Sequence, residues 1–345
     1  HGQHTPVQHV SGGLRRSQSA RCAVSGRSEA GGEKDDASKE QWKEDMTDEM
    51  RTISRESAAR ITETCGGEEL FHARGCALPE RAEVVDITEK LRALLFPGFF
   101  GDVSTARSEY AAGYALTGVC ARLRVQLEAA FCYAGNGEID VEEKAESVLK
   151  VFISSLPEVQ KLLLCDVEAA FDGDPAAKSR AGVVFSYPGL HAITVYRLAH
   201  ILYKEEVPFI PRIMTEYAHS LTGIDINAGA EIGRYFFIDH GTGVVIGETA
   251  VIGDFVKLYQ GVTLGALSTR LGQKLAGVKR HPTLGNRVTV YSGASVLGGE
   301  TVIGDDCVIG GNAFVTSSVP PHTRVSMKSP ELTFREMNRT VWEKA

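Results

Sequence analysis

The chain has 345 residues, of which 43% are hydrophobic, so it can bury one or two substantial cores. A formal net charge of −7 argues against a general binder of nucleic acids or of acidic membranes. No apolar stretch reaches the ~18 residues that a transmembrane helix requires. The seven cysteines are scattered and include no C-x-x-C pair, which predicts reduced thiols in a reducing compartment and no zinc site.

The first part of the chain predicts no packed structure. Residues 1–27 contain arginine, serine and glycine but no acidic residue, which is typical of an organelle transit segment or of a disordered tail. Residues 31–46 are acidic and lysine-rich, as in a solvated linker. We therefore expect a disordered or transit-like segment over residues 1–46. The expected location is cytoplasmic, or plastid or mitochondrial if residues 1–27 are the remnant of a transit segment.

Residues 47–223 carry the pattern of an α-helical domain. Apolar residues recur there at spacings of three and four, as in Leu116, Val119, Leu123 and Leu127, so that each series marks one buried face. Glycine and proline breakers separate the predicted helices, at 97–98, 134–137, 157 and 172–175. Residues 188–203 and 208–222 predict two further helices, the second ended by Gly223.

From residue 224 onward apolar residues return every six positions, a period that fits neither a helix nor an alternating strand. The repeat positions, with two short slips, are Ile226, Ile232, Ile238, Val244, Ile246, Ile252, Leu258, Leu264, Leu284, Val290, Val296, Leu297, Ile303, Ile309 and Val315. Such a period is typical of a parallel β-helix with about 18 residues in each coil. The expected fold class is α+β, an N-terminal α-helical domain followed by a left-handed parallel β-helix of hexapeptide repeats over residues 224–321. A polar loop at 265–283 interrupts the repeat, and residues 322–345 form a C-terminal tail.

An adjacent Asp239-His240 pair lies within this repeat. Histidine is the side chain best suited to removing a proton near neutral pH, so His240 is a candidate general base. Asp225 lies 15 residues earlier, close to one coil. Stacking of the coils can therefore place its carboxylate beside the imidazole, where it would fix the tautomer as the acid of a hydrolase triad does.

Seven motifs occur in the order and spacing found in serine O-acetyltransferases. They are Asp172-Gly173-Asp174-Pro175-Ala176, Tyr196-Arg197-Leu198-Ala199-His200, Gly223-Ile224-Asp225-Ile226, Asp239-His240-Gly241-Thr242-Gly243, Gly247-Glu248-Thr249, Gln260-Gly261-Val262-Thr263-Leu264-Gly265 and Lys279-Arg280-His281-Pro282. The chain therefore resembles this family of hexapeptide-repeat acyltransferases over about residues 87–328. The resemblance implies acetyl transfer from acetyl-CoA, the co-substrate, to the hydroxyl of L-serine. The products are O-acetyl-L-serine and CoA, in the first step of cysteine biosynthesis, and no metal takes part.

The resemblance also assigns roles to residues that bind the substrate. His240 matches the family's general base, and Asp174 and Asp239 match the residues that receive the ammonium group of serine. Arg280 and His281 match the residues that hold its carboxylate, a task that suits the bidentate fork of arginine. Glu248 is expected to line the same pocket.

Acetyl-CoA is expected along a groove between two β-helices, with its pantetheine arm at small residues. Gly265 and Ala266 match the family's Gly-Gly at the thioester end, with alanine in place of the second glycine. Ser292 and Gly310 are 18 residues apart, which predicts that they stack on successive coils where the cofactor passes.

Two expectations concern partners. One β-helix offers only half of such a groove, so we expect an obligate homotrimer, alone or as a dimer of trimers. Many serine acetyltransferases insert a terminal isoleucine into O-acetylserine sulfhydrylase, whereas this sequence ends at Ala345. Loss of about three methylene equivalents, at ~0.8 kcal/mol each, argues against a tight complex through this tail.

Three other functions share the repeat. An acetyltransferase that acts on sugars or other small hydroxyl acceptors would not be expected to bring this long helical domain. A γ-class carbonic anhydrase uses three zinc-binding histidines, two of them five residues apart, and the histidines beyond Gly223 lack that spacing. A non-catalytic β-helix scaffold would keep the repeat and lose the polar residues at 225, 239, 240, 280 and 281.

Overall fold

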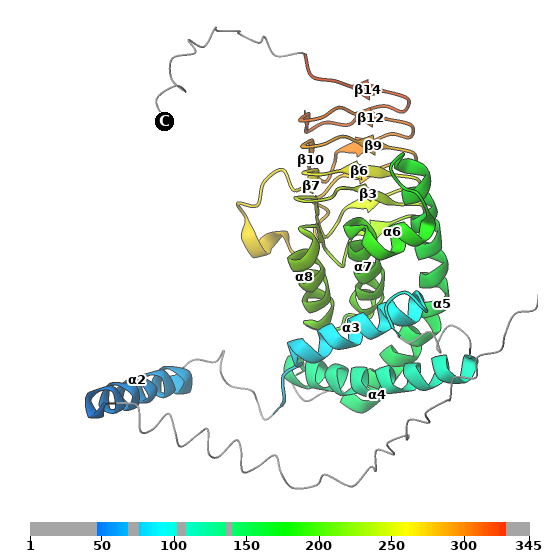
Figure 1. Ribbon diagram of the computed structural model, residues 1–345. Coiled ribbons are helices and arrows are strands. Elements are labelled where there is room, and N and C mark those ends of the chain that lie inside the picture. Colours follow the sequence, from blue (N-terminus) through cyan, green and yellow to red (C-terminus); the bar gives the residue numbers. More distant parts are fainter. Residues whose placement is uncertain (1–46, 68–75, 102–107, 136–139, 329–345) are drawn as a thin grey trace, which may run out of the picture. The chain divides into compact units, whose positions relative to one another are not determined.

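The computed structural model describes residues 47–67, 76–101, 108–135 and 140–328 (Figure 1). The chain divides into two units, residues 1–72 and residues 73–345. The expected transit-like segment (1–46) and most of the expected tail (322–345), including Ala345, lie outside the described residues, so the predictions about location and about the sulfhydrylase stay predictions. Within the described part, no helix combines the length and apolar character needed to cross a membrane.

In the first unit the structure describes one helix, α2 (Asp48–Gly67). Asp48 and Glu49 lie in its first turn, where acidic side chains favour the positive end of the helix dipole. The apolar side chains of Met50, Ile53 and Ile61 are exposed. The rest of the description concerns the second unit.

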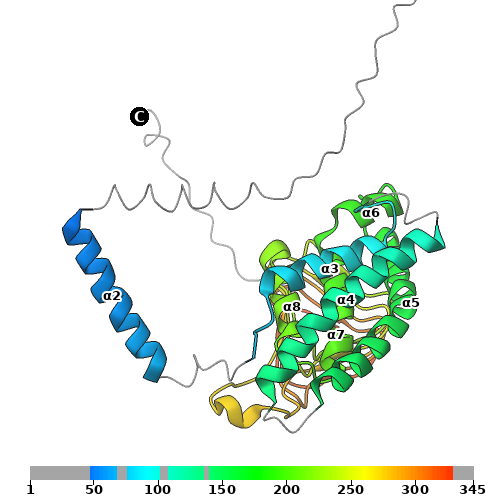
Figure 2. The same ribbon diagram turned by 90° about the horizontal axis from the view of Figure 1, so that it is seen from below.

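The second unit begins with a layer of helices, α3 (Arg81–Leu95), α4 (Glu109–Ala134), α5 (Val141–Gly173), α6 (Arg180–Ser186), α7 (Pro188–Lys204) and α8 (Ile210–Thr222). Ser108, Asp140 and Ser179 cap α4, α5 and α6 by accepting a backbone N–H of the first turn. Gly223 ends α8 with a φ of 69°, a left-handed conformation that favours glycine. α3 lies alongside α4 at the end of the unit remote from the last coils (Figures 1 and 2).

Pro157 was expected to end a helix, and this prediction was wrong. The residue lies inside α5, which continues for 33 residues. Proline removes one backbone hydrogen bond and normally kinks or breaks a helix. Here the buried face runs unbroken past the proline, through Phe152, Leu156, Val159 and Leu163. Packing of that face against α4 and α7 therefore outweighs the local preference.

The expectation of reduced thiols also needs correction, because Cys76 and Cys132 form a disulfide with their Cα atoms 5.9 Å apart. The segment before α3 packs on the last turns of α4, where the Glu80 backbone N–H donates to Gln126 Oε1 at 2.7 Å. This contact joins residues far apart in sequence, which spacing alone does not reveal. The free cysteines of the described residues are Cys65, Cys120, Cys165 and Cys307.

The β-helix follows directly on α8 and consists of three parallel sheets. The first sheet contains β1 (Asp225–Ile226), β4 (Val245–Ile246), β7 (Thr263–Gly265), β10 (Ser295–Leu297) and β13 (Phe314–Val315). The second contains β2 (Glu231–Ile232), β5 (Val251–Ile252), β8 (Thr283–Leu284) and β11 (Val302–Ile303). The third contains β3 (Phe237–Asp239), β6 (Lys257–Tyr259), β9 (Thr289–Val290), β12 (Val308–Ile309) and β14 (Arg324–Val325). Consecutive strands belong to different sheets, so the chain winds as the left-handed β-helix that the repeat predicts. In Figure 1 the strands of the third sheet stack in the order β3, β6, β9, β12 and β14.

The interior of the coils is built from the hexapeptide positions. Leu258, Leu264, Val290 and Ile303 are fully buried. The six-residue repeat slips by one position between Val296 and Leu297. The structure buries Val296 there, whereas Leu297 is only half-buried. The last strand, β14, lies beyond residue 321, where the repeat was expected to end.

The Tyr196-Arg197-x-x-His200 motif of α7 attaches the helices to the first coil. Tyr196 Oη donates to the carbonyl of Ala230 at 2.5 Å, and His200 Nδ1 lies 2.7 Å from the carbonyl of Ala228. Arg197 pairs with the buried Asp166 of α5 through Nε–Oδ2 at 2.7 Å and Nη2–Oδ1 at 3.0 Å. The same guanidinium donates to the carbonyl of Gly233 at 2.8 Å. This motif therefore fixes the angle between the helical layer and the coils.

Candidate active site

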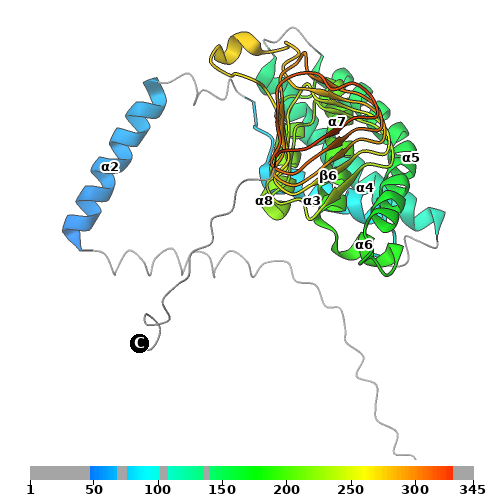
Figure 3. The ribbon, with the colours of Figure 1, turned by 90° about the horizontal axis from the view of Figure 1, so that it is seen from above.

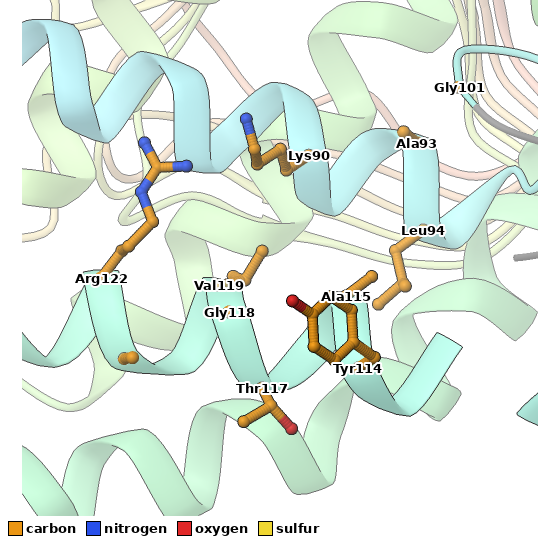
Figure 4. Close-up of a pocket in the computed structure, with 11 residues that line it drawn as sticks. Lys90, Ala93, Leu94, Gly101, Tyr114, Ala115, Thr117, Gly118, Val119 and Arg122 are labelled. Carbon is orange, nitrogen blue, oxygen red and sulfur yellow. The ribbon is translucent and has the colours of Figure 1, made fainter. Parts of the chain in front are cut away.

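A mostly apolar cavity lies away from every predicted site residue. It has a volume of about 500 Å³ and lies between α3 and α4, where Leu94, Tyr114 and Val119 line it (Figure 4). The predicted site residues lie instead on two corners of the β-helix. We call the turns that join the third sheet to the first the His240 corner, and the turns that join the first sheet to the second the Arg280 corner. Among the described residues no group of three or more His, Cys, Asp and Glu side chains could hold a metal ion.

At the His240 corner, β3 presents Asp239 and the turn that follows presents His240. His240 has a φ of 59°, so it adopts the left-handed backbone of a tight turn, and its side chain is 73% exposed. Its Nε2 lies 3.8 Å from Asp239 Oδ1. An exposed imidazole at the end of a strand is accessible to a substrate.

Asp174 reaches the same corner from the end of α5. Its carboxylate accepts hydrogen bonds from Tyr187 Oη and, at 2.8 Å, from the Ala176 backbone N–H. These two bonds hold the pKa of Asp174 below its ordinary value, and the charges of Lys257 and His240 contribute further. Burial, the Tyr187–Asp174 bond and the nearby Asp239 raise the pKa of Tyr187 to about 12. The structure thus brings Asp174, Asp239 and His240 together.

At the Arg280 corner, the turn after β4 and the end of the long loop meet. Arg280 Nη2 pairs with Glu248, whose Oε1 also accepts from Tyr203 Oη at 3.0 Å. Although burial raises the pKa of Glu248, these two hydrogen bonds hold it below the ordinary value. Thr249 fixes the loop end, because its hydroxyl accepts the backbone N–H groups of Arg280 at 2.9 Å and of His281 at 3.1 Å.

His281 is buried at this corner and packs on Gly247. A Cβ on residue 247 would lie 2.0 Å from the imidazole, which explains the glycine. His281 Nδ1 accepts the Thr249 backbone N–H at 3.0 Å, so the neutral ring carries its proton on Nε2. Burial, and then the charge of Arg280, lower the pKa of His281 to about 4. His281 is therefore a neutral hydrogen-bond donor rather than a base.

The two corners divide the predicted substrate residues. Asp174, Asp239 and His240 lie on one corner and Glu248, Arg280 and His281 on the other, and no described contact joins the two groups. The face between them is about six residues long, or roughly 20 Å at ~3.3 Å per residue, which far exceeds the length of serine. One chain therefore cannot contact a single serine with both groups.

Asp225 lies on β1, one coil from the His240 corner. Its backbone N–H donates to the carbonyl of Val244 at 2.9 Å, which stacks the two coils. Its carboxylate is half-buried, and the described residues contain no hydrogen bond between it and His240. The carboxylate nearest to the imidazole is that of Asp239.

The residues predicted to bind CoA divide in the same way. Gly265 and Ala266 lie at the Arg280 corner, where the long loop leaves β7, whereas Ser292 and Gly310 lie at the His240 corner. The predicted stacking of Ser292 on Gly310 is off by one residue. This coil contains 19 residues, since Val290 pairs with Ile309, so Ser292 lies against Gly311 and its carbonyl accepts the Asn312 N–H at 2.9 Å.

The long loop leaves the coils at the Arg280 corner and contains a short 3₁₀ helix, η3 (Gly272–Leu275). Figure 3 shows it projecting sideways from the stacked coils. Its apolar side chains Leu267, Leu271 and Val278 are exposed in the single chain.

Comparison with known proteins shows which family the chain belongs to. No family model matches the chain. The plasmid serine acetyltransferase of Synechococcus elongatus is 44% identical over 261 residues, which cover 72% of this chain and 82% of that protein. The chain belongs to the serine acetyltransferase family. The serine acetyltransferase of Helicobacter pylori is 50% identical over 168 residues, 48% of this chain and 94% of that protein.

Solved structures agree with this assignment. Serine acetyltransferase isoform 3 of Entamoeba histolytica, in complex with cysteine, covers 73% of this chain and 84% of its own with a TM-score of 0.64 and 36% identity. Serine acetyltransferase 1 of the same organism, in complex with L-cysteine, has a TM-score of 0.63 and 37% identity, over 70% of this chain and 86% of that one. The present serine acetyltransferase therefore transfers an acetyl group from acetyl-CoA to the hydroxyl of serine. The predictions of fold class and of enzymatic activity are confirmed.

The pattern of residues alone missed three side chains of this serine acetyltransferase. Tyr187 directly precedes α7, and its position in the sequence gave no signal of contact with Asp174. Tyr203, at the other end of α7, reaches Glu248. Lys257 lies one coil above Phe237, in register on the neighbouring strand, and its Nζ lies 3.3 Å from Asp239 Oδ2. Phe237 and Lys257 are 20 residues apart, so the 18-residue coil expected from the repeat would not have placed the lysine there.

Neutral His281 predicts a loss of stability in acid. The unfolded chain takes up a proton at the ordinary histidine pKa of about 6.5, whereas the folded imidazole does so only near pH 4. Folding is therefore increasingly disfavoured as the pH falls from about 6.5 toward 4. Urea unfolding midpoints measured across this range should decline less steeply for His281→Gln than for the unmodified protein. Equal slopes would contradict the assignment of a neutral buried imidazole.

Proposed function

We propose that His240 is the general base of the serine acetyltransferase reaction. The serine hydroxyl attacks the thioester carbonyl of acetyl-CoA while His240 takes its proton. The tetrahedral intermediate then collapses, the carbon–sulfur bond breaks, and the leaving thiolate receives that proton from the imidazolium. O-acetyl-L-serine and CoA result, with His240 neutral again. The exposure of His240 and its position beside Asp239 support this role, whereas the buried and hydrogen-bonded His281 is unsuited to it.

Asp225 is proposed to orient His240 during the reaction. Its carboxylate is half-buried one coil away, and its register against β4 places it next to the turn that carries the imidazole. Rotation of the exposed ring toward it would let Nδ1–H donate to the carboxylate and stabilise the imidazolium.

Serine is proposed to lie between two protomers. Asp174 and Asp239 of one protomer would receive its ammonium group. Arg280 and His281 of the neighbouring protomer would hold its carboxylate, with Glu248 keeping the guanidinium in place. The observation that carries this proposal is the division of the six substrate residues between two corners that are a full face apart.

The same arrangement requires an obligate homotrimer, alone or as a dimer of trimers. Three β-helices arranged about a threefold axis would place the His240 corner of each protomer against the Arg280 corner of the next. Acetyl-CoA would lie in the groove between them, with Gly265 and Ala266 from one protomer and Ser292 and Gly310 from the other. The exposed apolar side chains of the long loop would then pack on the neighbouring protomer.

Mixed trimers test this proposal. A His240→Ala chain and an Arg280→Ala chain are each expected to lose most of kcat/KM for serine. In a trimer containing both, one of the three junctions pairs an intact His240 corner with an intact Arg280 corner. Purified mixed trimers carrying two affinity tags should therefore regain about one third of the unmodified kcat/KM for serine.

The matched control mixes His240→Ala with Asp239→Asn. Both substitutions lie on the same corner, so no junction is intact and activity should stay low. If the His240→Ala and Arg280→Ala mixture also stays inactive, while both chains assemble, the site is contained in one protomer and the proposed arrangement is wrong.

A further inference from the structure

The ammonium group of Lys257 lies in a well-formed binding site of its own. Its Nζ donates to the carbonyl of Gly173 at 2.7 Å and lies 3.3 Å from Asp239 Oδ2. The ring centroids of Phe237 and Tyr259 lie 4.8 Å and 4.5 Å from it. A carboxylate, a carbonyl and two aromatic faces are the groups that recognise a protonated amine.

Register and packing bring these groups together. Phe237 pairs with Lys257, and Asp239 with Tyr259, on the adjacent strands β3 and β6. The end of α5 covers them, because Gly173 lies against Phe237 so closely that a Cβ would meet the ring at 2.8 Å. The Lys257 side chain is only 19% exposed. It is therefore held in place rather than extended into solvent.

This site coincides with the one proposed for the ammonium of serine. Asp239 is a residue that the substrate's amino group would contact, and Lys257 already places a group of the same chemistry beside it. The charge of Lys257 also reaches Asp174, whose pKa is lowered first by Tyr187 and the Ala176 N–H and then by Lys257. A second ammonium must enter next to this positive charge or displace it.

We propose that Lys257 sets the affinity and selectivity of the enzyme for the amino group of its substrate, by occupying the ammonium position beside Asp239. The inference rests on the proposed function, because it takes Asp239 as the ammonium ligand. Lys257 offsets one of the two negative charges of Asp174 and Asp239, so an entering amine meets a weaker attraction. Only substrates with a protonated amine are affected.

Removal of the charge should therefore tighten serine binding. Lys257→Gln keeps a donor for the Gly173 carbonyl, and Lys257→Met keeps the length of the side chain without a donor. Both variants are expected to lower the KM for serine on the order of threefold to tenfold at pH 7.5, with kcat changed less. Reactivity toward 3-hydroxypropanoate, which is serine without its amino group, should stay unchanged, so the preference for serine rises.

The matched control is Lys150→Gln. Lys150 pairs with Glu146 at 2.8 Å within α5, in the helical layer. The KM for serine should not change in this variant. Lys257→Arg, which keeps the charge, should retain the unmodified KM for serine more closely than Lys257→Gln.

Asp239→Asn separates the two proposals. It should raise the KM for serine if Asp239 binds the ammonium. If it does not, the proposed serine site is wrong and the inference about Lys257 fails with it. If Asp239→Asn raises the KM but Lys257→Gln and Lys257→Met leave it unchanged or raise it, Lys257 only supports the fold of the corner, and the inference alone is overturned.

Discussion

Replacing His240 with alanine should lower kcat by about 10²- to 10⁴-fold, the usual range for the loss of a general base. The serine hydroxyl keeps its proton at neutral pH, and no other described histidine occupies the His240 corner. Affinity for acetyl-CoA should change little, because the imidazole acts on serine rather than on the cofactor. Release of the CoA thiol under saturating substrates measures kcat, and calorimetric titration measures CoA binding.

Two further variants sharpen this result. His322→Ala is the matched control, because His322 is equally exposed but lies near Asp306 on the third corner of the coils, with Nδ1 3.5 Å from Oδ2. Its kcat should be normal. Asp225→Asn should reduce kcat less than His240→Ala, since it removes only the orienting acid. Near-normal turnover in His240→Ala would show that His240 is not the general base.

Replacing Arg197 with leucine should destabilise the second unit by about 3–5 kcal/mol, because it leaves the buried carboxylate of Asp166 without its partner. Asp166 is 1% exposed and accepts hydrogen bonds from two guanidinium nitrogens and from the Phe236 backbone N–H at 3.0 Å. The substitution also removes the hydrogen bond that Arg197 donates to the carbonyl of Gly233. Urea unfolding followed by circular dichroism measures the change in the free energy of unfolding.

The pH dependence gives this prediction a second test. Burial raises the pKa of Asp166 even beside Arg197, and without the guanidinium the pKa should rise further. A carboxyl group whose folded pKa lies above its unfolded pKa contributes stability at low pH. This contribution is lost as the pH rises through the folded pKa. The deficit of Arg197→Leu should therefore be larger at pH 8 than at pH 5.

Arg180→Leu is the matched control for this pair. Arg180 also makes two hydrogen bonds to one carboxylate, that of Glu168, but both side chains are exposed to solvent. Water screens such a pair, so its removal should have a much smaller effect. Equal losses in Arg180→Leu and Arg197→Leu would show that burial of the Asp166–Arg197 pair does not matter. The combined Asp166→Leu and Arg197→Leu variant should recover much of the lost stability, since no unpaired buried charge remains.

The sequence by itself determined the features that depend on local pattern. The six-residue period predicted the β-helix because each of its inward positions must be apolar, and Leu258, Leu264 and Ile303 are buried as expected. Gly223 predicted the end of α8 because the left-handed conformation there favours glycine. The spacing of the motifs indicated the family, and with it the activity.

The tertiary structure alone decided which of these residues meet. Pro157 continues α5 because a long-range buried face outweighs the lost hydrogen bond, and Cys76 meets Cys132 because α3 and α4 pack together. The 19-residue coil shifts Ser292 from Gly310 to Gly311. The substrate residues fall on two corners because a short strand between two turns directs each turn to a different edge of the coil. Lys257 joins the first of these corners through the register of β3 and β6, which no local pattern in the sequence specifies.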